Sequence, residues 1–364
     1  QVSRGVADPA VPAGAGTGAS PATRRGGAAA RRRMSPVLLG VVLGAALVIV
    51  VGLSLTLGAA ALSPAEVWSA LMARLGGTPV DPLVEGIVWD LRMPRILTAA
   101  LVGAGLGVAG VVMQAVTRNP LADPYLLGLS SGASFGAVAV LLAGLSFLLP
   151  VAAFIGALIA AAAALGLAAA MGGLTPSRTV LAGVAVSAFA AALTSFVVFW
   201  FVTGDSYREV LSWLLGSVAG ARWPEVSIAA VSFFIAGLPL LMTGRLLDAF
   251  AFGDTSAAAL GLHVPRTRWL MLGLTALLTG GLVSVSGSIG FVGLVLPHAV
   301  RLLVGPGHRA LLPLSALAGG VFLVLADTIA RTVFDPRELP VGVITALVGA
   351  PVFALLLLRA RKLA

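Results

Sequence analysis

The sequence predicts an all-α protein that crosses a membrane about ten times. Apolar residues make up 59% of its 364 residues and charged residues only 10%, against about 45–50% and about 25% in soluble domains. The charged residues are spaced so that long uncharged gaps separate them, and a helix needs about 20 apolar residues to cross a bilayer. The gaps are continuous and rich in Ala, Leu and Gly, which favours helices over the alternating strands of a membrane barrel.

Eight uncharged gaps provide the spans. Six gaps fit one helix each, namely 37–65, 96–117, 179–204, 226–244, 310–326 and 339–358. The gap at 124–177 is too long for one span and is predicted to turn between Gly144 and Pro150. The gap at 269–300 is predicted to divide around residues 284–288. The amphipathic segment 204–222 is expected to lie on the outer surface.

Two domains are predicted. Residues 1–35 form a basic tail, rich in Ala, Gly, Pro and Arg, that is expected to be disordered and cytoplasmic. Residues 36–362 form the transmembrane domain. The first apolar run is longer than the 7–15-residue core of a signal peptide, so a retained first helix is favoured over a signal cleaved near residues 59–61.

Basic residues indicate the orientation in the cytoplasmic membrane. With the N-terminus inside, sixteen of the 23 basic residues lie on the inner side and seven on the outer side. Basic residues concentrate on the cytoplasmic side of membrane proteins, so both termini are predicted inside. The net charge of +9 is therefore interpreted as a topology signal with some attraction to anionic lipid, and no nucleic-acid partner is predicted.

Residues 245–265 fall on the inner side and are predicted to form short helices broken by Gly253 and Gly261. Asp254 is an acidic helix start, and Gly261 is a typical helix stop. Helices this short cannot span a membrane. They are predicted to dock another protein.

Several chemistries find little support. The absence of cysteine excludes thiolate sites, and the isolated His263, His298 and His308 do not form a metal site. The sequence 105–110 matches G-x-G-x-x-G but lies within an apolar span, where closely spaced glycines allow helices to pack. The sequence 128–132 matches the G-x-S-x-G nucleophile elbow.

A hydrolase at Ser130 would need a histidine base and an acid that orients it. No acid partner is evident, so a helix start made of small residues is favoured, and no catalytic residue is predicted. A proton-coupled carrier is a further alternative, but such carriers usually hold acidic residues inside the bilayer. Here the acidic residues fall in loops or near helix ends, where Asp327 and Arg331 are spaced to pair locally.

The segment Leu91–Arg95 is expected to open the second span. It is interpreted either as an interfacial anchor, with proline in the first helical turn, or as a pair of exposed guanidinium groups. Such groups would bind carboxylates on a partner protein.

Longer motifs are distributed over nearly the whole chain. They are Leu91–Arg95, Gln114–Pro124, Leu127–Ala133, Trp213–Ser217, Leu260–Gly261, Gly287–His298, His308–Pro313, Ala326–Arg331 and Glu338–Pro351. In content and order they resemble the FecCD-type permeases, from about residue 38 to residue 362.

The resemblance implies the permease fold of a type II ABC importer. It implies two permease copies, expected to be a homodimer, with two cytoplasmic ATPase subunits and an extracytoplasmic binding protein. The expected substrate is ferric siderophore or a related metal chelate, with haem or cobalamin as the alternative. The chain lacks the G-x-x-x-x-G-K-[ST] loop, so it is expected to be a transport subunit without enzyme activity or a cofactor of its own, while its partner uses ATP.

The resemblance also assigns residues. ATPase coupling maps to 246–261, where Asp248, Gly253, Asp254, Ala257, Leu260 and Gly261 match the family pattern. Binding-protein docking maps to Arg92, Arg95 and Arg331. The translocation path is expected along the fifth and tenth helices, 179–203 and 340–358, with Ser187, Thr194 and Ser195 as its few polar points.

Overall fold

A computed structural model describes residues 34–58, 60–74, 76, 79–202, 204, 206–333 and 337–361. The predicted tail at 1–33, and the basic side chains that end the chain, lie outside the described residues. The features below concern the compact unit that begins at Arg33.

The elements in the described residues are all helices. Seven helical segments are long and apolar enough to cross a membrane: Pro36–Thr56 (α1), Pro82–Val116 (α3, η1 and α4), Ser146–Ala170 (η3 and α6), Pro176–Phe201 (α7), Trp223–Leu241 (α9, η4 and α10), Val264–Ser286 (α13) and His308–Thr332 (α15). Three shorter apolar helices join them: Leu129–Leu142 (α5), Val292–Val304 (α14) and α16 (Val341–Arg361), which is apolar to Leu356. The prediction of an all-helical membrane fold with about ten spans is confirmed.

The predicted breaks in the long apolar gaps are also confirmed. α5 ends at Leu142 and α6 begins at Leu149, while α13 ends at Ser286 and α14 begins at Val292. The remaining short helices are α2 (Pro64–Arg74), η2 (Pro124–Leu127), α8 (Ser206–Leu215), α11 (Gly244–Ala251) and α12 (Asp254–Ala259).

The start of the second span was predicted wrongly. The segment Leu91–Arg95 does not open the helix, because the helix begins at Pro82 and continues through η1 (Ile87–Arg92) into α4 (Met93–Val116). Pro94 has no N–H group, and its ring would clash with the carbonyl group four residues earlier in a regular helix. The wider π-helical turn of η1 lies directly before it and lets the helix continue past the proline.

The amphipathic helix α2 was not foreseen, although its sequence carries a signal. Ser63 and Glu66 form a reciprocal cap in which the Ser63 backbone N–H donates to Glu66 Oε2 (2.7 Å) and the Glu66 N–H donates to Ser63 Oγ (3.2 Å). Hydrogen bonds from Ser63 hold the pKa of Glu66 below its ordinary value. The spacing S-x-x-E is the capping-box pattern, and it predicts this helix start.

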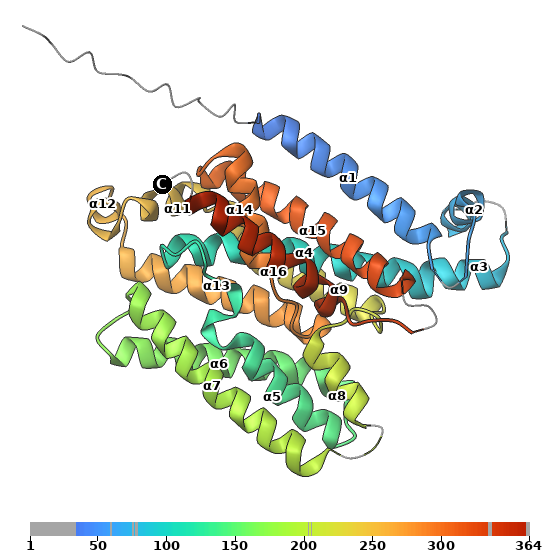
Figure 1. Ribbon diagram of the computed structural model, residues 1–364, viewed down its shortest axis with the longest axis horizontal. Coiled ribbons are helices and arrows are strands. Elements are labelled where there is room, and N and C mark those ends of the chain that lie inside the picture. The colour runs from blue at the N-terminus through green and yellow to red at the C-terminus, as the bar shows by residue number, and fades with distance from the viewer. Residues whose placement is uncertain are drawn as a thin grey trace, which may run out of the picture. The chain divides into compact units, whose positions relative to one another are not determined.

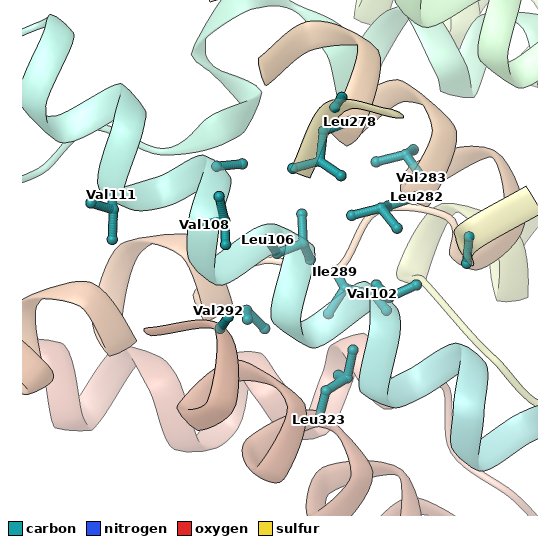
Figure 2. Packing of buried hydrophobic residues seen from close by; sticks show 14 of the residues in the cluster. Val102, Leu106, Val108, Val111, Leu278, Leu282, Val283, Ile289, Val292 and Leu323 are labelled. Atoms are coloured by element: carbon teal, nitrogen blue, oxygen red, sulfur yellow. The ribbon is translucent and has the colours of Figure 1, made fainter. Parts of the chain in front are cut away.

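The core is built around α4, which packs on α13, α14 and α15. Figure 2 shows side chains of α4, α13, α15 and the 287–292 connection gathered around Leu106. Glycines let the backbones meet: a methyl carbon added to Gly103 would lie 2.2 Å from the Gly319 carbonyl oxygen, and one added to Gly107 would lie 2.3 Å from that of Ser315. The packing interpretation of these glycines is confirmed.

The sequence around Ser130 is likewise structural. Gly128 has a positive φ of 78° and begins α5, and Gly132 packs against the backbone of Gly156 on α6. The Ser130 hydroxyl group hydrogen-bonds to the hydroxyl group of Ser288. A second serine is no general base, so the small-residue helix start accounts for the motif.

Two ends of the helix bundle carry the connections. α11 and α12 lie at one end and α2 and α3 at the opposite end, with α4 running between them (Figure 1). These are called the α12 end and the α2 end. Seven arginines and three acidic residues belong to segments at the α12 end: Arg118, Arg178, Arg245, Arg266, Arg268, Arg301, Arg309, Asp123, Asp248 and Asp254.

Candidate functional site

Residues 244–261 form a small helical platform at the α12 end. α11 and α12 are separated by Gly253, whose φ is +96°, and α12 is followed by Gly261, whose φ is +85°. Side chains larger than glycine rarely adopt a positive φ. The predicted short helices, with breaks at these two glycines, are therefore confirmed, while their role in coupling stays a prediction.

Arg268 of α13 fixes the α12 half of the platform. Its Nη2 donates to Asp254 Oδ1 (2.8 Å), and its Nη1 donates to the Leu174 carbonyl oxygen (2.7 Å). The guanidinium group also lies 5.5 Å from the centre of the Phe250 ring. The more distant Arg118 Nη2 is 3.8 Å from the same carboxylate oxygen.

His308 of α15 fixes the α11 half. Asp248 Oδ1 accepts the His308 backbone N–H at 2.9 Å and lies 2.7 Å from the ring Nδ1. His308 is buried, whereas the Asp248 side chain is partly exposed. Asp248 and Asp254 are thus attachment points, each held by a group from the transmembrane bundle.

The platform buries one set of apolar side chains and exposes another. Ala257 is fully buried with Ala249, Phe250 and Val264. Phe252 and Leu260, by contrast, are 77% and 69% exposed. Of the residues that the resemblance assigned to coupling, Leu260 faces outward, Ala257 packs inward, and the two aspartates bind the bundle.

A second charged cluster lies at the α2 end, between α4 and α15. Arg95 Nε donates to Asp327 Oδ2 (2.8 Å), Arg95 Nη2 donates to Asp327 Oδ1 (2.9 Å), and Arg95 Nη1 donates to Glu338 Oε2 (2.7 Å). Arg95 is 7% exposed and Asp327 is 2% exposed. The pair is a buried two-point contact of the kind that arginine makes with carboxylates. Asp327 therefore binds Arg95, and its predicted pairing with Arg331 is wrong.

The exposure expected for the guanidinium groups of Arg92 and Arg95 is also wrong, and Arg331 is buried as well. Arg92 and Arg331 are 6% and 7% exposed. Arg92 donates to the carbonyl oxygens of Thr56 (3.1 Å) and Ala60, and Arg331 donates to the carbonyl oxygen of Ser54 and to its hydroxyl oxygen (2.6 Å). Fixed planar guanidinium groups bind the carbonyl oxygens at the end of α1 because those oxygens lack partners within the helix.

These arginines nevertheless border an open space. A cavity of about 370 Å³ is lined by Arg92, Arg95, Arg222, Arg331, Asp90 and Glu338 among other residues. The docking role stays a prediction, and this cavity gives a partner side chain access to the guanidinium groups.

The predicted polar points of the path do not share one face. On α7, Ser195 is exposed and Ser187 is half-buried beside Gly128. Thr194 is 6% exposed and donates its hydroxyl hydrogen to the Ala190 carbonyl oxygen (2.9 Å). Adjacent helical residues point about 100° apart, so Thr194 and Ser195 lie on different faces of α7, and their assignment to the path stays a prediction. The exposed face of α7 carries Leu181, Val184, Phe189, Phe196 and Phe199.

No cluster of three or more metal-ligating side chains occurs in the described part of the chain. The motifs in the sequence did not indicate the anchoring roles of Arg268 and His308. Arg268 lies in the second turn of α13, and His308 is the first residue of α15. Their partners lie 14 and 60 residues away in the sequence.

The FecCD transport family matches residues 34–359, which is nearly all of the described chain. The chain belongs to the FecCD transport family. This FecCD chain is 40% identical to the vitamin B12 import system permease BtuC of Vibrio cholerae, over 90% of its own length and 94% of that protein's. It is 39% identical to the Fe(3+)-citrate import system permease YfmD of Bacillus subtilis, over 78% of its own length and 88% of that protein's.

A solved structure agrees with the sequence relatives. An inward-facing ABC transporter assigned to the metal-chelate type superposes with a TM-score of 0.78 at 33% identity, covering 89% of this chain and all of the other chain. The FecCD chain is therefore a multi-pass membrane permease of an ABC importer. As such it works with ATPase and permease partners.

Proposed function

We propose that this permease imports a bulky metal chelate, with a ferric siderophore or ferric citrate-like complex as the first candidate substrate and cobalamin or haem as the alternative. Relatives named for Fe(3+)-citrate and for vitamin B12 are about equally similar to the chain. A metal held in a large organic shell is the chemistry that these two substrates share.

The observation that supports this function best is the platform at 244–261. It exposes Phe252 and Leu260, and its two aspartates attach it to α13 and α15. Exposed apolar patches mark surfaces for protein contact. We assign this surface to the ATPase subunit, which places the α12 end in the cytoplasm with both termini, as the excess of basic residues on that side favours.

Two copies of the chain are proposed to enclose the path. The outward face of α7 is almost wholly apolar, and α16 likewise exposes the apolar side chains Leu347, Leu355 and Leu358. An apolar wall offers few hydrogen bonds that could hold a polar chelate during passage. Substrate selection then falls to an extracytoplasmic binding protein that docks at the α2 end.

Uptake into proteoliposomes tests the proposal. The permease, with its co-purified ATPase and its binding protein, is given radiolabelled ferric siderophore, ferric citrate, haemin or cyanocobalamin, with and without internal ATP. ATP-dependent accumulation of one chelate is expected. ATP-independent uptake driven by a proton gradient would instead support a secondary carrier and would contradict the proposal.

A further inference from the structure

Arg268 occupies a position between the platform and the start of α7. It lies in the first turns of α13, is 4% exposed, and binds groups on both sides of itself. On one side is Asp254, the first residue of α12, and on the other is the carbonyl oxygen of Leu174. In the described residues, no other side chain hydrogen-bonds to both α12 and the turn between α6 and α7.

The Leu174 carbonyl group is directly connected to the beginning of α7. Thr175 caps α7 by accepting the Arg178 backbone N–H on its hydroxyl oxygen, and Thr179 N–H donates to the Thr175 carbonyl oxygen (2.9 Å). The Leu174 carbonyl group is thus one peptide bond away from the residue that caps α7. α7 then continues to Phe201 as one helix without an internal proline or a π-helical turn.

Arg268 is also restrained on its flat face. The guanidinium group lies over the Phe250 ring of α11, so α11, α12 and the α6–α7 turn all contact one rigid group. A planar guanidinium group can hold two acceptors in fixed directions, whereas a lysine ammonium group is a single point charge on a flexible stem. The connection thus depends on arginine geometry and not on positive charge alone.

We propose that Arg268 is a positioning residue that transmits displacement of α12 to α7. A pull on α12 moves Asp254, the Arg268 guanidinium group follows the carboxylate, and the Leu174 carbonyl group with the cap of α7 follows the guanidinium group. The Asp248–His308 contact holds α11 to α15, so the platform is attached to a second helix besides α13. The inference rests on the proposed function, because it takes the platform as the place where the ATPase acts.

The first experiment measures ATP hydrolysed per chelate molecule imported, in the proteoliposomes described above. Arg268→Lys and Arg268→Gln should keep the ATPase subunit bound and hydrolysing, while uptake per ATP falls at least about fivefold, the low end of typical coupling between sites. Arg266→Gln is the matched control, because Arg266 lies in the same turn, loses the same charge and is exposed. It should keep the wild-type ratio.

Unchanged uptake per ATP in both Arg268 variants would overturn the proposal, and so would an equal loss in Arg266→Gln. Loss of ATPase binding alone would also overturn it, because Arg268 would then serve docking only. A wild-type permease that imports nothing with ATP counts against the proposed function and not against this connection.

A second experiment needs no transport and covers a variant that folds poorly. Asp254→Asn weakens the Arg268 contact without touching α7, and hydrogen exchange is measured at the amides of Thr175, Ser177, Arg178 and Thr179 in the purified full chain. Faster exchange there is expected, with no change at the distant start of α16. Wild-type exchange at 175–179 would overturn the proposed connection.

Discussion

The two charged clusters, at opposite ends of the bundle, differ in what their ion pairs hold together. At the α2 end, Arg95 and Asp327 join two central spans and are both almost completely buried. At the α12 end, Asp254 and Asp248 keep side-chain exposures of 38% while their partners Arg268 and His308 are buried. The first cluster stabilises the packing of α4 on α15. The second attaches the platform, whose Phe252 and Leu260 side chains remain exposed.

The contrast predicts different effects on stability when the two clusters are broken. Buried pairs are strongly destabilising to break, because removing one partner strands the other charge. Pairs that are partly in water contribute less to stability, so breaking one of them should leave the fold intact. The predictions below run from the largest expected effect on stability to the smallest.

Arg95→Leu should have the largest effect. It leaves the Asp327 carboxylate buried without its partner, which costs about 3–5 kcal/mol. Thermal unfolding of the detergent-purified chain, followed by tryptophan fluorescence, measures this loss. The exposed pair Arg74–Glu85 provides the control, since Arg74→Leu should cost no more than about 1 kcal/mol. Equal losses in the two variants would remove the distinction between buried and exposed pairs.

The double variant Arg95→Leu/Asp327→Leu tests whether the loss of stability in Arg95→Leu arises from the unpaired carboxylate of Asp327. Because apolar side chains can replace a buried ion pair without a stranded charge, the double variant should be more stable than Arg95→Leu alone. A double variant as unstable as the sum of the single variants would show that the two residues act independently.

Gly103→Ala should cause the next largest loss of stability, because Gly103 lies in the same contact between α4 and α15 that the Arg95–Asp327 pair joins. Its methyl group would lie 2.2 Å from the backbone oxygen of Gly319, so α4 and α15 must separate, at a cost of about 1–3 kcal/mol. Gly44→Ala on α1 is the matched control, because no atom lies within 4 Å of the added carbon. The melting temperature should fall for Gly103→Ala and stay level or rise for Gly44→Ala.

Arg92→Glu should affect both stability and docking. The substitution removes the donors that bind the carbonyl oxygens of Thr56 and Ala60 and places a carboxylate beside them, a loss of about 1–3 kcal/mol. Binding-protein affinity, measured by surface plasmon resonance, should fall as well if the cavity admits an acidic side chain. A stable variant with unchanged affinity would contradict both assignments.

Phe252→Asp and Leu260→Asp should hardly change stability, because exposed positions usually tolerate substitution within about 0.5 kcal/mol. They should, however, sharply reduce co-purification of the ATPase subunit. Phe147→Asp at the α2 end is the matched control, since Phe147 is also 77% exposed. Loss of the ATPase in the Phe147 variant, or its retention in both platform variants, would contradict the assigned surface.

Much of the fold can be predicted from the sequence because it depends on local patterns. The uncharged gaps locate the spans, Gly144 and residues 284–288 locate the breaks, and Gly253 with Asp254 locates the short helices. These features arise from burial in lipid, backbone freedom and helix capping, which act within a few residues. The capping box at Ser63–Glu66 belongs to the same class and predicts α2.

The charged contacts could not be predicted from local patterns, because they join segments that are distant in the sequence. Arg95 and Asp327 are 232 residues apart, and the local spacing of Asp327 and Arg331 favoured the wrong pair. Arg92 was taken as exposed because the second span was expected to begin near it, whereas the helix begins ten residues earlier, at Pro82. Only the packing of α1, α4 and α15 decides which carbonyl and carboxylate oxygens reach these guanidinium groups.

The central claim is that the platform at 244–261 receives the ATPase. A photo-crosslinking amino acid placed at Leu260 of the assembled importer tests it most directly, with the same residue placed at Phe147 for comparison. Crosslinking from position 260 to the ATPase subunit, in a yield that changes when ATP is added, is the result expected. Crosslinking to the ATPase from position 147 and none from position 260 would contradict both the docking surface and the orientation of the chain.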